Sequence, residues 1–259
     1  MLTLQRASKR FPNGYLALDG ISLSVGEGEI VGVVGASGCG KSTLLRLLAG
    51  LEKPSVGAAT FDGTPLAGPR DEIGVVFQEP RLMPWLTVED NVSFGLRHLS
   101  AAERKTRVTE TLARVGLGHF AKSLPRELSG GMAQRVAIAR ALAAQPKVLL
   151  LDEPFSALDA FTRLALQEHL LELWSYDKPT FVLVTHDIDE ALALADRIVL
   201  MRGHPGRIHR DFAVDLPRPR SRSAARFLSW KEEVLRELHV TAATGRSAIA
   251  ASPLRAAAV

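Results

Sequence analysis

The segment that most constrains the fold of this chain is Gly35-Ala36-Ser37-Gly38-Cys39-Gly40-Lys41-Ser42, which fits the pattern G-x-x-x-x-G-K-[ST]. An apolar stretch at 30–34 precedes it, and a helical pattern at 41–49 follows. Glycines let the backbone curl, so that successive N–H groups and the positive end of a helix face one anion. Lys41 adds positive charge toward the β- and γ-phosphates, and Ser42 offers a hydroxyl to Mg²⁺. The segment therefore predicts a triphosphate-binding loop between a strand and a helix.

Two carboxylates follow another apolar strand, in the segment Lys147-Val148-Leu149-Leu150-Leu151-Asp152-Glu153. Asp152 is thereby expected at the carboxyl end of the strand, the edge at which open α/β sheets bind ligands. We expect Asp152 to hold Mg²⁺ through its water shell, and Glu153 to polarise a water for in-line attack on the γ-phosphate. The alternative is that both side chains only cap the next helix. With the first segment, this one indicates a P-loop nucleoside triphosphatase.

The arrangement of apolar runs predicts the fold class. Helical patterns alternate with β-branched runs at 30–34, 73–77, 148–151, 181–184 and 198–201. This alternation is typical of an α/β fold, here a RecA-like P-loop core whose parallel sheet is covered on both faces. Runs at 2–6, 18–25 and 59–61 predict an N-terminal antiparallel β subdomain that makes the sheet mixed at one end.

The remaining regions differ in character from this core. Between about 87 and 145 the strand signal disappears, and alanine, leucine, arginine and glutamate predict an inserted α-helical subdomain. Prolines exclude long helices and central strands at 202–207 and 216–220. A short helix is expected at 225–240, and 241–259 is expected to be mobile. We therefore predict one ATPase domain at 1–220, followed by a short helix and tail at 221–259.

Composition limits where the chain can work. The 259 residues hold one cysteine, Cys39, so neither an internal disulfide nor a zinc site built from several cysteines is possible. No apolar run approaches the roughly 18 residues needed to cross a bilayer, and the first residues lack the pattern of a secretory signal, so we expect a cytoplasmic protein. The formal charge of +4 comes from a local excess: seven arginines and two aspartates lie between 202 and 226.

The class of P-loop protein is decided by further residues. GTPases read guanine with an Asn-Lys-x-Asp element, but the two asparagines here, Asn13 and Asn91, do not precede lysine. The segment Leu128-Ser129-Gly130-Gly131-Met132-Ala133-Gln134-Arg135 lies just before the Asp-Glu strand, and with it the sequence resembles the ABC (ATP-binding cassette) ATPase family. The family usually has glutamine at the position of Met132. The alternative for this segment is an ordinary serine helix cap.

The resemblance implies how this signature segment is used. Ser129 and the two glycines open a helix, so they present N–H groups and a positive dipole to an anion. One chain has no use for two such surfaces on opposite sides of one γ-phosphate, but a head-to-tail dimer does. We therefore expect each bound ATP to lie between the P-loop of one copy and the signature segment of the other, with two ATP sites per dimer.

Other family elements follow in the family's order, and each implies a role for one residue here. Gln78 matches the glutamine that reaches Mg²⁺ and the attacking water, Asp159 matches the aspartate that crosses the dimer interface, and His186 matches the histidine that bonds the γ-phosphate. Taken alone, such residues are usually structural; in this ordered set we read them as functional.

Phe11 matches the aromatic platform for adenine, with Tyr15 as the competing candidate and a plain core aromatic as the alternative. Cys39 has no expected catalytic role, although the positive field of Lys41 can lower its pKa and make the thiol reactive. The predicted catalytic residues are Glu153, His186, Gln78 and Lys41, and the predicted Mg²⁺ residues are Ser42, Gln78 and Asp152. The predicted ATP-binding residues are Phe11, Gly35, Ala36, Ser37, Gly38, Cys39, Gly40, Lys41, Ser42, Thr43, Ser129, Gly130, Gly131 and Asp159.

The resemblance also implies partners. No membrane domain is fused to the cassette, so we expect two permease subunits, an indirectly acting substrate-binding protein, and a position at the cytoplasmic face of the inner membrane. The exposed apolar loop at 78–86 suits a groove for a permease helix, with a satellite core cluster as the alternative. Segments 152–163, 205–208 and 214–220 look like the nitrate, sulfonate and taurine importer subgroup, and we favour aliphatic sulfonate as cargo.

Two other functions compete with this prediction. A non-transport ABC ATPase acting on nucleic acid or ribosomes would use the basic segment at 202–226 as a phosphate contact. Such proteins usually carry coiled-coil inserts or two cassettes, and neither is visible in this sequence. A small-molecule P-loop kinase is disfavoured because Glu153 and His186 are suited to water as the acceptor. We therefore expect no nucleic-acid partner.

Overall fold

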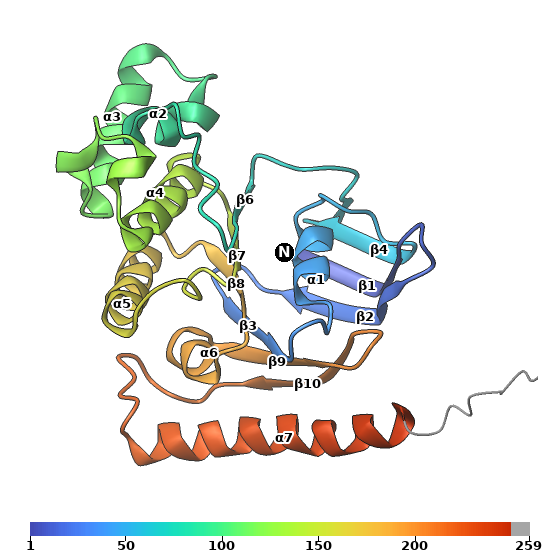
Figure 1. Cartoon of the computed structure of the whole chain (residues 1–259). Helices are drawn as coiled ribbons and strands as arrows, with labels where there is room; N and C mark the ends of the chain where they lie inside the picture. The colour runs from blue at the N-terminus through green and yellow to red at the C-terminus, as the bar shows by residue number, and fades with distance from the viewer. Residues whose placement is uncertain (250–259) are drawn as a thin grey trace, which may run out of the picture.

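The computed structural model describes residues 1–249, and the side chains of that range apart from 177 and 239–249. Two sheets with helices between and around them make up the fold (Figure 1). The strands are β1 (Leu2–Arg10), β2 (Leu16–Val25), β3 (Ile30–Gly35), β4 (Val56–Phe61), β5 (Thr64–Pro65), β6 (Ile73–Val76), β7 (Val148–Asp152), β8 (Thr180–Thr185), β9 (Arg197–Arg202) and β10 (Arg207–Ala213). The α-helices are α1 (Lys41–Leu48), α2 (Val88–Ser93), α3 (Ala101–Arg114), α4 (Gly130–Ala143), α5 (Ala160–Asp177), α6 (Ile188–Leu194) and α7 (Ala225–Ile249); short 3₁₀ turns cover Phe94–Leu96, Gly118–Phe120 and Pro125–Glu127.

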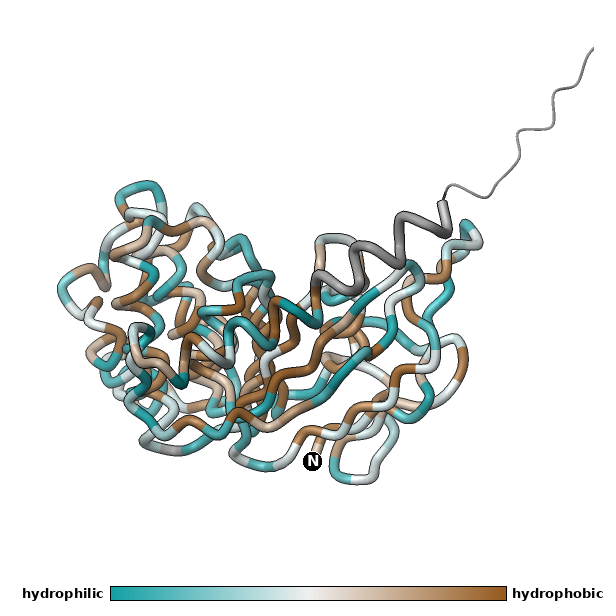
Figure 2. Tube along the Cα trace, turned by 90° about the horizontal axis from the view of Figure 1, so that it is seen from below, coloured by the Kyte–Doolittle hydropathy of each residue, from teal (hydrophilic) through white to brown (hydrophobic). Residues whose placement is uncertain are grey.

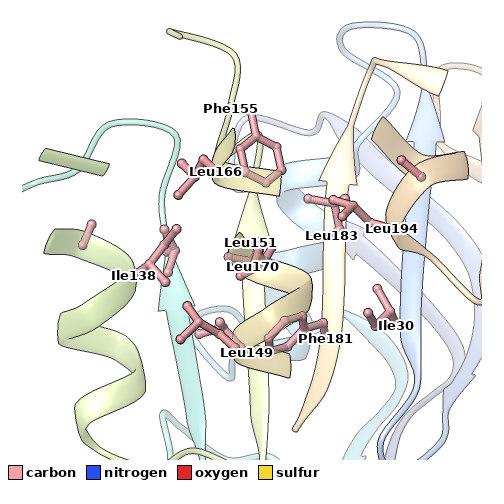
Figure 3. Close-up of a cluster of buried hydrophobic side chains, with 14 of the residues drawn as sticks. Ile30, Ile138, Leu149, Leu151, Phe155, Leu166, Leu170, Phe181, Leu183 and Leu194 are labelled. Atoms are coloured by element: carbon pink, nitrogen blue, oxygen red, sulfur yellow. The ribbon is translucent and has the colours of Figure 1, made fainter. Parts of the chain in front are cut away.

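The larger sheet has the order β10-β9-β3-β8-β7-β6, in which β10 alone runs antiparallel to its neighbour. Successive residues of its central strands point to opposite faces. Val148 and Leu150 pack with α1 and the N-terminal strands, while Leu149 and Leu151 pack with α4, α5 and α6. Figure 3 shows Leu149, Leu151 and Phe181 within the second of these clusters. The predicted sheet, buried on both faces, is confirmed.

The N-terminal strands form a sheet of their own, with the order β2-β1-β4-β5. The prediction that they would make the main sheet mixed was therefore wrong in detail, although their antiparallel pairing is correct. Their apolar side chains, such as Leu2 and Leu4, pack against α1, so the helix separates the two sheets. The antiparallel strand of the main sheet is instead β10, which the prolines around it concealed in the sequence.

Between β6 and β7 the regular elements are helical, as the sequence predicted, and α2, α3 and α4 lie together at one end of the molecule (Figure 1). The division of the chain into domains stays a prediction. Helix α7 is longer than the expected helix at 225–240 and includes 241–249. The rest of the predicted mobile tail, 250–259, lies outside the described residues.

Hydrophobic segments run through the strands in the middle of the molecule, and hydrophilic segments lie mainly at its periphery (Figure 2). Helix α7 runs along β10 and α6 (Figure 1), where Trp230 stacks on Phe212 with ring centroids 5.4 Å apart. Within the described residues, no helix has both the length and the apolar character needed to cross a bilayer.

Candidate functional site

The P-loop joins β3 to α1, as predicted. Gly38 and Gly40 have φ angles of 81° and 93°, in the left-handed region that glycine adopts without strain. A Cβ atom on Gly35 would lie 2.5 Å from the Met201 carbonyl oxygen, so only glycine fits there. Lys41 begins α1, is 6% exposed, and donates to the carbonyl oxygens of Gly35 and Ala36 at 2.8 and 3.1 Å. The ammonium group therefore lies within the loop that its backbone forms.

Ser42 and Asp152 come together at the carboxyl edge of the main sheet. The Ser42 hydroxyl donates to Asp152 Oδ1 at 3.2 Å, although the residues are 110 positions apart. Burial raises the pKa of Asp152 most, the nearby Glu153 raises it further, and the Ser42 hydrogen bond opposes both effects. The alternative that these carboxylates cap the next helix is wrong, because Asp159 is the N-cap of α5.

Glu153 and His186 form the second pair at this edge. His186 Nδ1 lies 3.1 Å from Glu153 Oε2; the glutamate side chain is 20% exposed and the histidine side chain 57%. Glu153 has a φ angle of 45°, which is uncommon for a residue with a side chain. Its N–H donates to the Val184 carbonyl oxygen at 2.9 Å, which holds this strained turn beside β8.

The signature segment lies at the start of α4. Ser129 is the N-cap, and its hydroxyl accepts from Met132 N at 3.3 Å, so the helix-cap reading is correct as far as it goes. Ser129 and Gly130 are exposed, and no atom lies within 4 Å of a Cβ built on Gly130. Gly131 is buried, and a Cβ there would meet Thr162 at 2.4 Å. Packing against α5 therefore accounts for Gly131, while Ser129 and Gly130 remain free to contact an external ligand.

The loop after β6 carries Gln78, which is exposed and follows Phe77 at the strand end. A buried asparagine and a half-buried arginine hold the rest of this loop. Asn91, 0% exposed, accepts from Met83 N at 2.8 Å and donates to the Met83 and Leu86 carbonyl oxygens. Arg140 donates to the carbonyl oxygens of Pro80 and Arg81, at 2.9 Å each. The sequence reasoning missed both supports, which hold a loop whose Trp85 is 75% exposed.

Asp159 caps α5, accepting from the backbone N–H groups of Phe161 and Thr162 at 3.1 Å each. Hydrogen bonding from Thr162 lowers the pKa of the Asp159 carboxyl. Asp159 and its neighbour Phe161, which is 86% exposed, therefore lie at the surface on the first turn of a helix. This placement is compatible with contact to a second chain.

Both candidates for the adenine platform belong to the turn between β1 and β2. Phe11 N donates to the Tyr15 carbonyl oxygen at 2.9 Å, and Lys9 Nζ lies 5.3 Å from the centre of the Phe11 ring. Tyr15 is 48% exposed, whereas Phe11 is half-buried. The choice of Phe11 therefore stays a prediction.

The structure corrects the expected reactivity of Cys39. The thiol is 1% exposed, and this burial raises its pKa, while the charge of Lys41 lowers it less. The thiol belongs to the buried cluster that includes Leu18 and Met201, and a Cβ built on Gly35 would lie 2.7 Å from its Sγ. The turn between β9 and β10 packs on the backbone of the same loop: a Cβ on Gly206 would lie 2.0 Å from the Cys39 carbonyl oxygen. Gly206 N also donates to the Ala17 carbonyl oxygen at 2.9 Å. This turn against the P-loop is a further feature that the motifs did not reveal.

Comparison with known proteins identifies the family to which a chain with this site is similar. The sequence profile described as ABC transporter matches residues 18–156, from β2 to just beyond Glu153. An aliphatic sulfonates import ATP-binding protein, SsuB 1 of Xanthomonas axonopodis pv. citri, is 50% identical over 243 residues, which are 92% of this chain and 96% of that protein. The SsuB protein of Bacillus licheniformis is 48% identical, covering 93% of this chain and 95% of its own length.

A relative with a different name and a solved structure were also found. The bicarbonate transport ATP-binding protein CmpC of Synechococcus elongatus is 50% identical over 230 residues, which are 85% of this chain but only 35% of that longer protein. Among solved structures, the dimeric post-hydrolysis state of the ATP-binding cassette MJ0796, bound to ADP and Pi, is 36% identical. It superposes with a TM-score of 0.74 and covers 84% of this chain and 100% of its own.

Proposed function

Because the chain belongs to the ABC transporter family, we propose that it is the ATP-binding and ATP-hydrolysing subunit of an importer for aliphatic sulfonates or related small anions. The observation that carries the hydrolytic part is the meeting of two pairs at one sheet edge. Ser42 with Asp152 lies at the P-loop, and Glu153 with His186 lies one residue further along the chain. A phosphate-binding loop thus lies next to a carboxylate that can accept a proton from water.

The residues present fit Mg²⁺ as the metal that accompanies ATP. The Ser42 hydroxyl and the Asp152 carboxylate offer hard oxygen ligands, and they lie 3.2 Å apart, close enough to act on one ion. Mg²⁺ when bound would neutralise charge on the β- and γ-phosphates. We propose that Ser42 holds the ion directly, that Asp152 acts through water, and that Gln78 approaches from its exposed loop.

The Glu153–His186 contact restricts how these residues can act. An ionised Glu153 can only accept a hydrogen bond, so Nδ1 of His186 carries the proton in this pairing. A neutral imidazole then has an Nε2 that cannot donate to a phosphate oxygen. His186 must therefore leave Glu153, or become protonated, before it donates to the γ-phosphate. Only Oε2 of Glu153 contacts His186, so Oε1 can accept a proton from the attacking water in either case.

We propose that the ATP sites form between two copies of the chain and that two permease subunits dock on the loop at 78–86. Support comes from the exposed Ser129 and Gly130, and from a Trp85 that is 75% exposed on a loop fixed by Asn91 and Arg140. Closure around ATP and reopening after hydrolysis would then move this loop against the permeases. The working position would be the cytoplasmic face of the inner membrane.

The nucleic-acid alternative is not favoured by the geometry of the basic segment. Each of its seven arginines has a hydrogen-bonding partner inside the chain; examples are Arg207 with Asp19 at 3.0 Å and Arg226 with Asp215 at 2.9 Å. Four of them, Arg207, Arg210, Arg218 and Arg226, bond carboxylates, and charges paired in this way contribute less to a field that attracts phosphates. The other three bond neutral acceptors.

The cargo can be tested in the source cell. A strain lacking the gene should fail to grow with ethanesulfonate as the sulfur source but grow with sulfate. The wild-type gene should restore growth, and the Lys41→Ala gene should not. Unimpaired growth on ethanesulfonate in the deletion strain, together with lost uptake of nitrate, taurine or bicarbonate, would contradict aliphatic sulfonate as cargo.

A further inference from the structure

Arg163, on the first turn of α5, connects segments that come from different parts of the site. Its Nη2 donates to the Leu158 carbonyl oxygen at 3.0 Å, in the loop that ends at Asp159. Its Nη1 donates to Asp187 Oδ2 at 3.5 Å, and its Nε lies 3.9 Å from Glu190 Oε1. One guanidinium group therefore touches the loop before α5, the N-cap of α6 and the first turn of α6.

The acceptors of this guanidinium lie directly beside His186. Thr185 Oγ1 donates to the Glu190 carboxylate at 2.6 Å and accepts from Asp187 N at 3.0 Å, so the residues on both sides of His186 belong to one network. The Glu190 side chain is 5% exposed and that of Arg163 is 32% exposed. Arg163 Nε is buried and has no hydrogen-bond partner among the described atoms.

A guanidinium group is planar, and its N–H groups point in fixed directions. If the loop at Leu158 shifts, Arg163 must either follow it or lose the carbonyl contact, and following it changes the contacts with Asp187 and Glu190. Burial limits the replacement of these contacts by water and raises the pKa of Glu190. The contacts of Arg163 therefore connect the two loops, and a shift of one that Arg163 follows alters the contacts of the other.

We propose that Arg163 is a positioning residue that links the Asp159 loop to the His186 loop. On the proposed function, a second copy of the chain contacts Asp159, and Arg163 would convert this contact into the placement of His186 beside Glu153. The site in one chain would thereby respond to the presence of the partner, and hydrolysis rather than ATP affinity would depend on Arg163.

The first test compares Arg163→Ala and Arg163→Lys with the wild-type protein in the assembled transporter. We expect Arg163→Ala to lower kcat by about 2- to 30-fold, which is the fold-change that corresponds to the coupling energies found for residues between two sites. The affinity for a fluorescent ATP analogue should stay within about twofold, because the P-loop is untouched. Lysine has one charged head and cannot reproduce the fork, so Arg163→Lys should recover only part of kcat. A kcat equal to that of the wild type in Arg163→Ala would overturn the proposal.

A second measurement separates positioning from structural damage. Arg163→Ala leaves the buried Glu190 carboxylate without its cation, and Glu190→Gln removes that charge while keeping an acceptor for Thr185. If Glu190→Gln restores kcat in the Arg163→Ala background, the loss came from the unpaired charge and the proposal is wrong. If the double variant is no faster than Arg163→Ala alone, the loss does not come from the unpaired charge, and the link between the loops is supported.

A double-mutant cycle with Asp159 completes the test. Each variant lowers kcat by some factor. If Arg163 acts through the Asp159 loop, the product of the factors for Asp159→Ala and Arg163→Ala should be larger than the factor for the double variant. Losses that multiply fully would mean independent action and would contradict the proposal. A wild-type protein without ATPase activity would instead contradict the proposed function, so the two failures can be told apart.

Discussion

Glu153, the proposed general base, has a backbone conformation that is costly for a residue with a side chain. A φ of 45° costs such a residue on the order of 1–3 kcal/mol in backbone strain. Here the hydrogen bond from Glu153 N–H to the Val184 carbonyl oxygen helps to hold this conformation. The turn directs the carboxylate toward His186 rather than along the strand. Replacement of the carboxylate should therefore change chemistry more than binding.

We predict that Glu153→Gln retains ATP affinity within about threefold and lowers kcat by at least about 100-fold, the usual contribution of a general base. Glutamine keeps the size and one acceptor oxygen but does not take a proton at neutral pH. Equilibrium binding of a fluorescent ATP analogue and steady-state phosphate release measure the two quantities. Lys41→Ala is the contrasting variant and should weaken binding itself. Near-normal turnover by Glu153→Gln would remove Glu153 as the base.

Cys39 gives a second test at the scale of one residue. A raised thiol pKa leaves a smaller thiolate fraction at any given pH, and only the thiolate is a strong nucleophile. We predict that iodoacetamide labels Cys39 more slowly in the native protein than in urea throughout about pH 7 to 9. Burial slows the native reaction further. Faster labelling of the native protein would show that the field of Lys41 outweighs burial.

Residues in contiguous motifs were predictable because their spacing along the chain carries the signal. The P-loop, Asp152 and Glu153 were predicted in this way, and His186 from the resemblance to the ABC ATPase family; the structure places them at one sheet edge. Arg163, Asn91 and Arg140 were not, because their contacts are set by tertiary packing and a lone arginine or asparagine has no distinctive pattern. The pKa of Cys39 was misjudged because residues of its buried cluster, such as Met201, come from distant parts of the sequence.

At the scale of elements, the basic segment at 202–226 attaches the C-terminal region to the core. Arg220 donates to the carbonyl oxygens of Leu192 and Ala195 at 2.7 and 2.6 Å, at the end of α6, and to that of Leu216 at 2.9 Å. Arg218 donates to the Leu194 carbonyl oxygen and pairs with Asp196 at 2.6 Å. Carbonyls at a helix end favour such cations. These two arginines therefore cap the helix whose other end adjoins His186.

We predict that Arg220→Ala lowers the free energy of unfolding by about 1–3 kcal/mol, since it leaves buried carbonyls unpaired. Burial lowers the pKa of Arg220 to about 10, so it is charged at neutral pH. Because this pKa lies below the unfolded value, the cost of burying its charge is constant at lower pH and declines only above about pH 10. Urea unfolding at pH 7.5 should show the loss, and exposed Arg126→Ala is the matched control. Equal stability of both variants would contradict the capping role.

The exposed Trp85 in the loop at 78–86 allows the proposed permease contact to be tested. Trp85→Ala should reduce binding of the subunit to its permeases by about tenfold or more, because large exposed aromatics often dominate interfaces. Thermal unfolding should change little, since Trp85 is 75% exposed. Co-purification with tagged permeases measures binding, and Tyr176→Ala, which removes an aromatic side chain that is 71% exposed elsewhere, is the control. Equal recovery of both variants would place the docking surface somewhere else.

The order of secondary structure was more predictable than the way the elements assemble. Buried strands such as β7 and β8 are recognisable from apolar runs alone. Strand β10 has the burial pattern of an exposed edge strand and lies between prolines, so its local sequence resembles a loop; pairing with β9 determines its conformation. The separation of the N-terminal strands into their own sheet likewise depends on α1, which packs between the two sheets.

At the scale of the whole molecule, the two candidate phosphate-binding surfaces, the P-loop and the signature segment, lie among different helices and strands. Helix α1, which follows the P-loop, packs against β1, β2, β3, β7 and β8, whereas α4, which follows Ser129, packs against α2, α3, α5 and β6. Figure 1 shows the two helices on opposite sides of the main sheet's strands. If both surfaces bind the same ATP, the second must come from another copy of the chain.

This arrangement can be tested by mixing two inactive variants. Lys41→Ala disables the P-loop, and Ser129→Glu places a negative charge on the exposed signature segment. If each ATP lies between two copies, neither variant alone forms an intact ATP site. In a mixed dimer, the P-loop of the Ser129→Glu chain meets the signature segment of the Lys41→Ala chain, so one complete site forms. With Glu153→Gln also present in both chains to prevent turnover, we predict that mixing restores retention of about one ATP per mixed dimer and a dimer in sedimentation. Sites contained within single chains would give no restoration, because each chain would still carry its own defect.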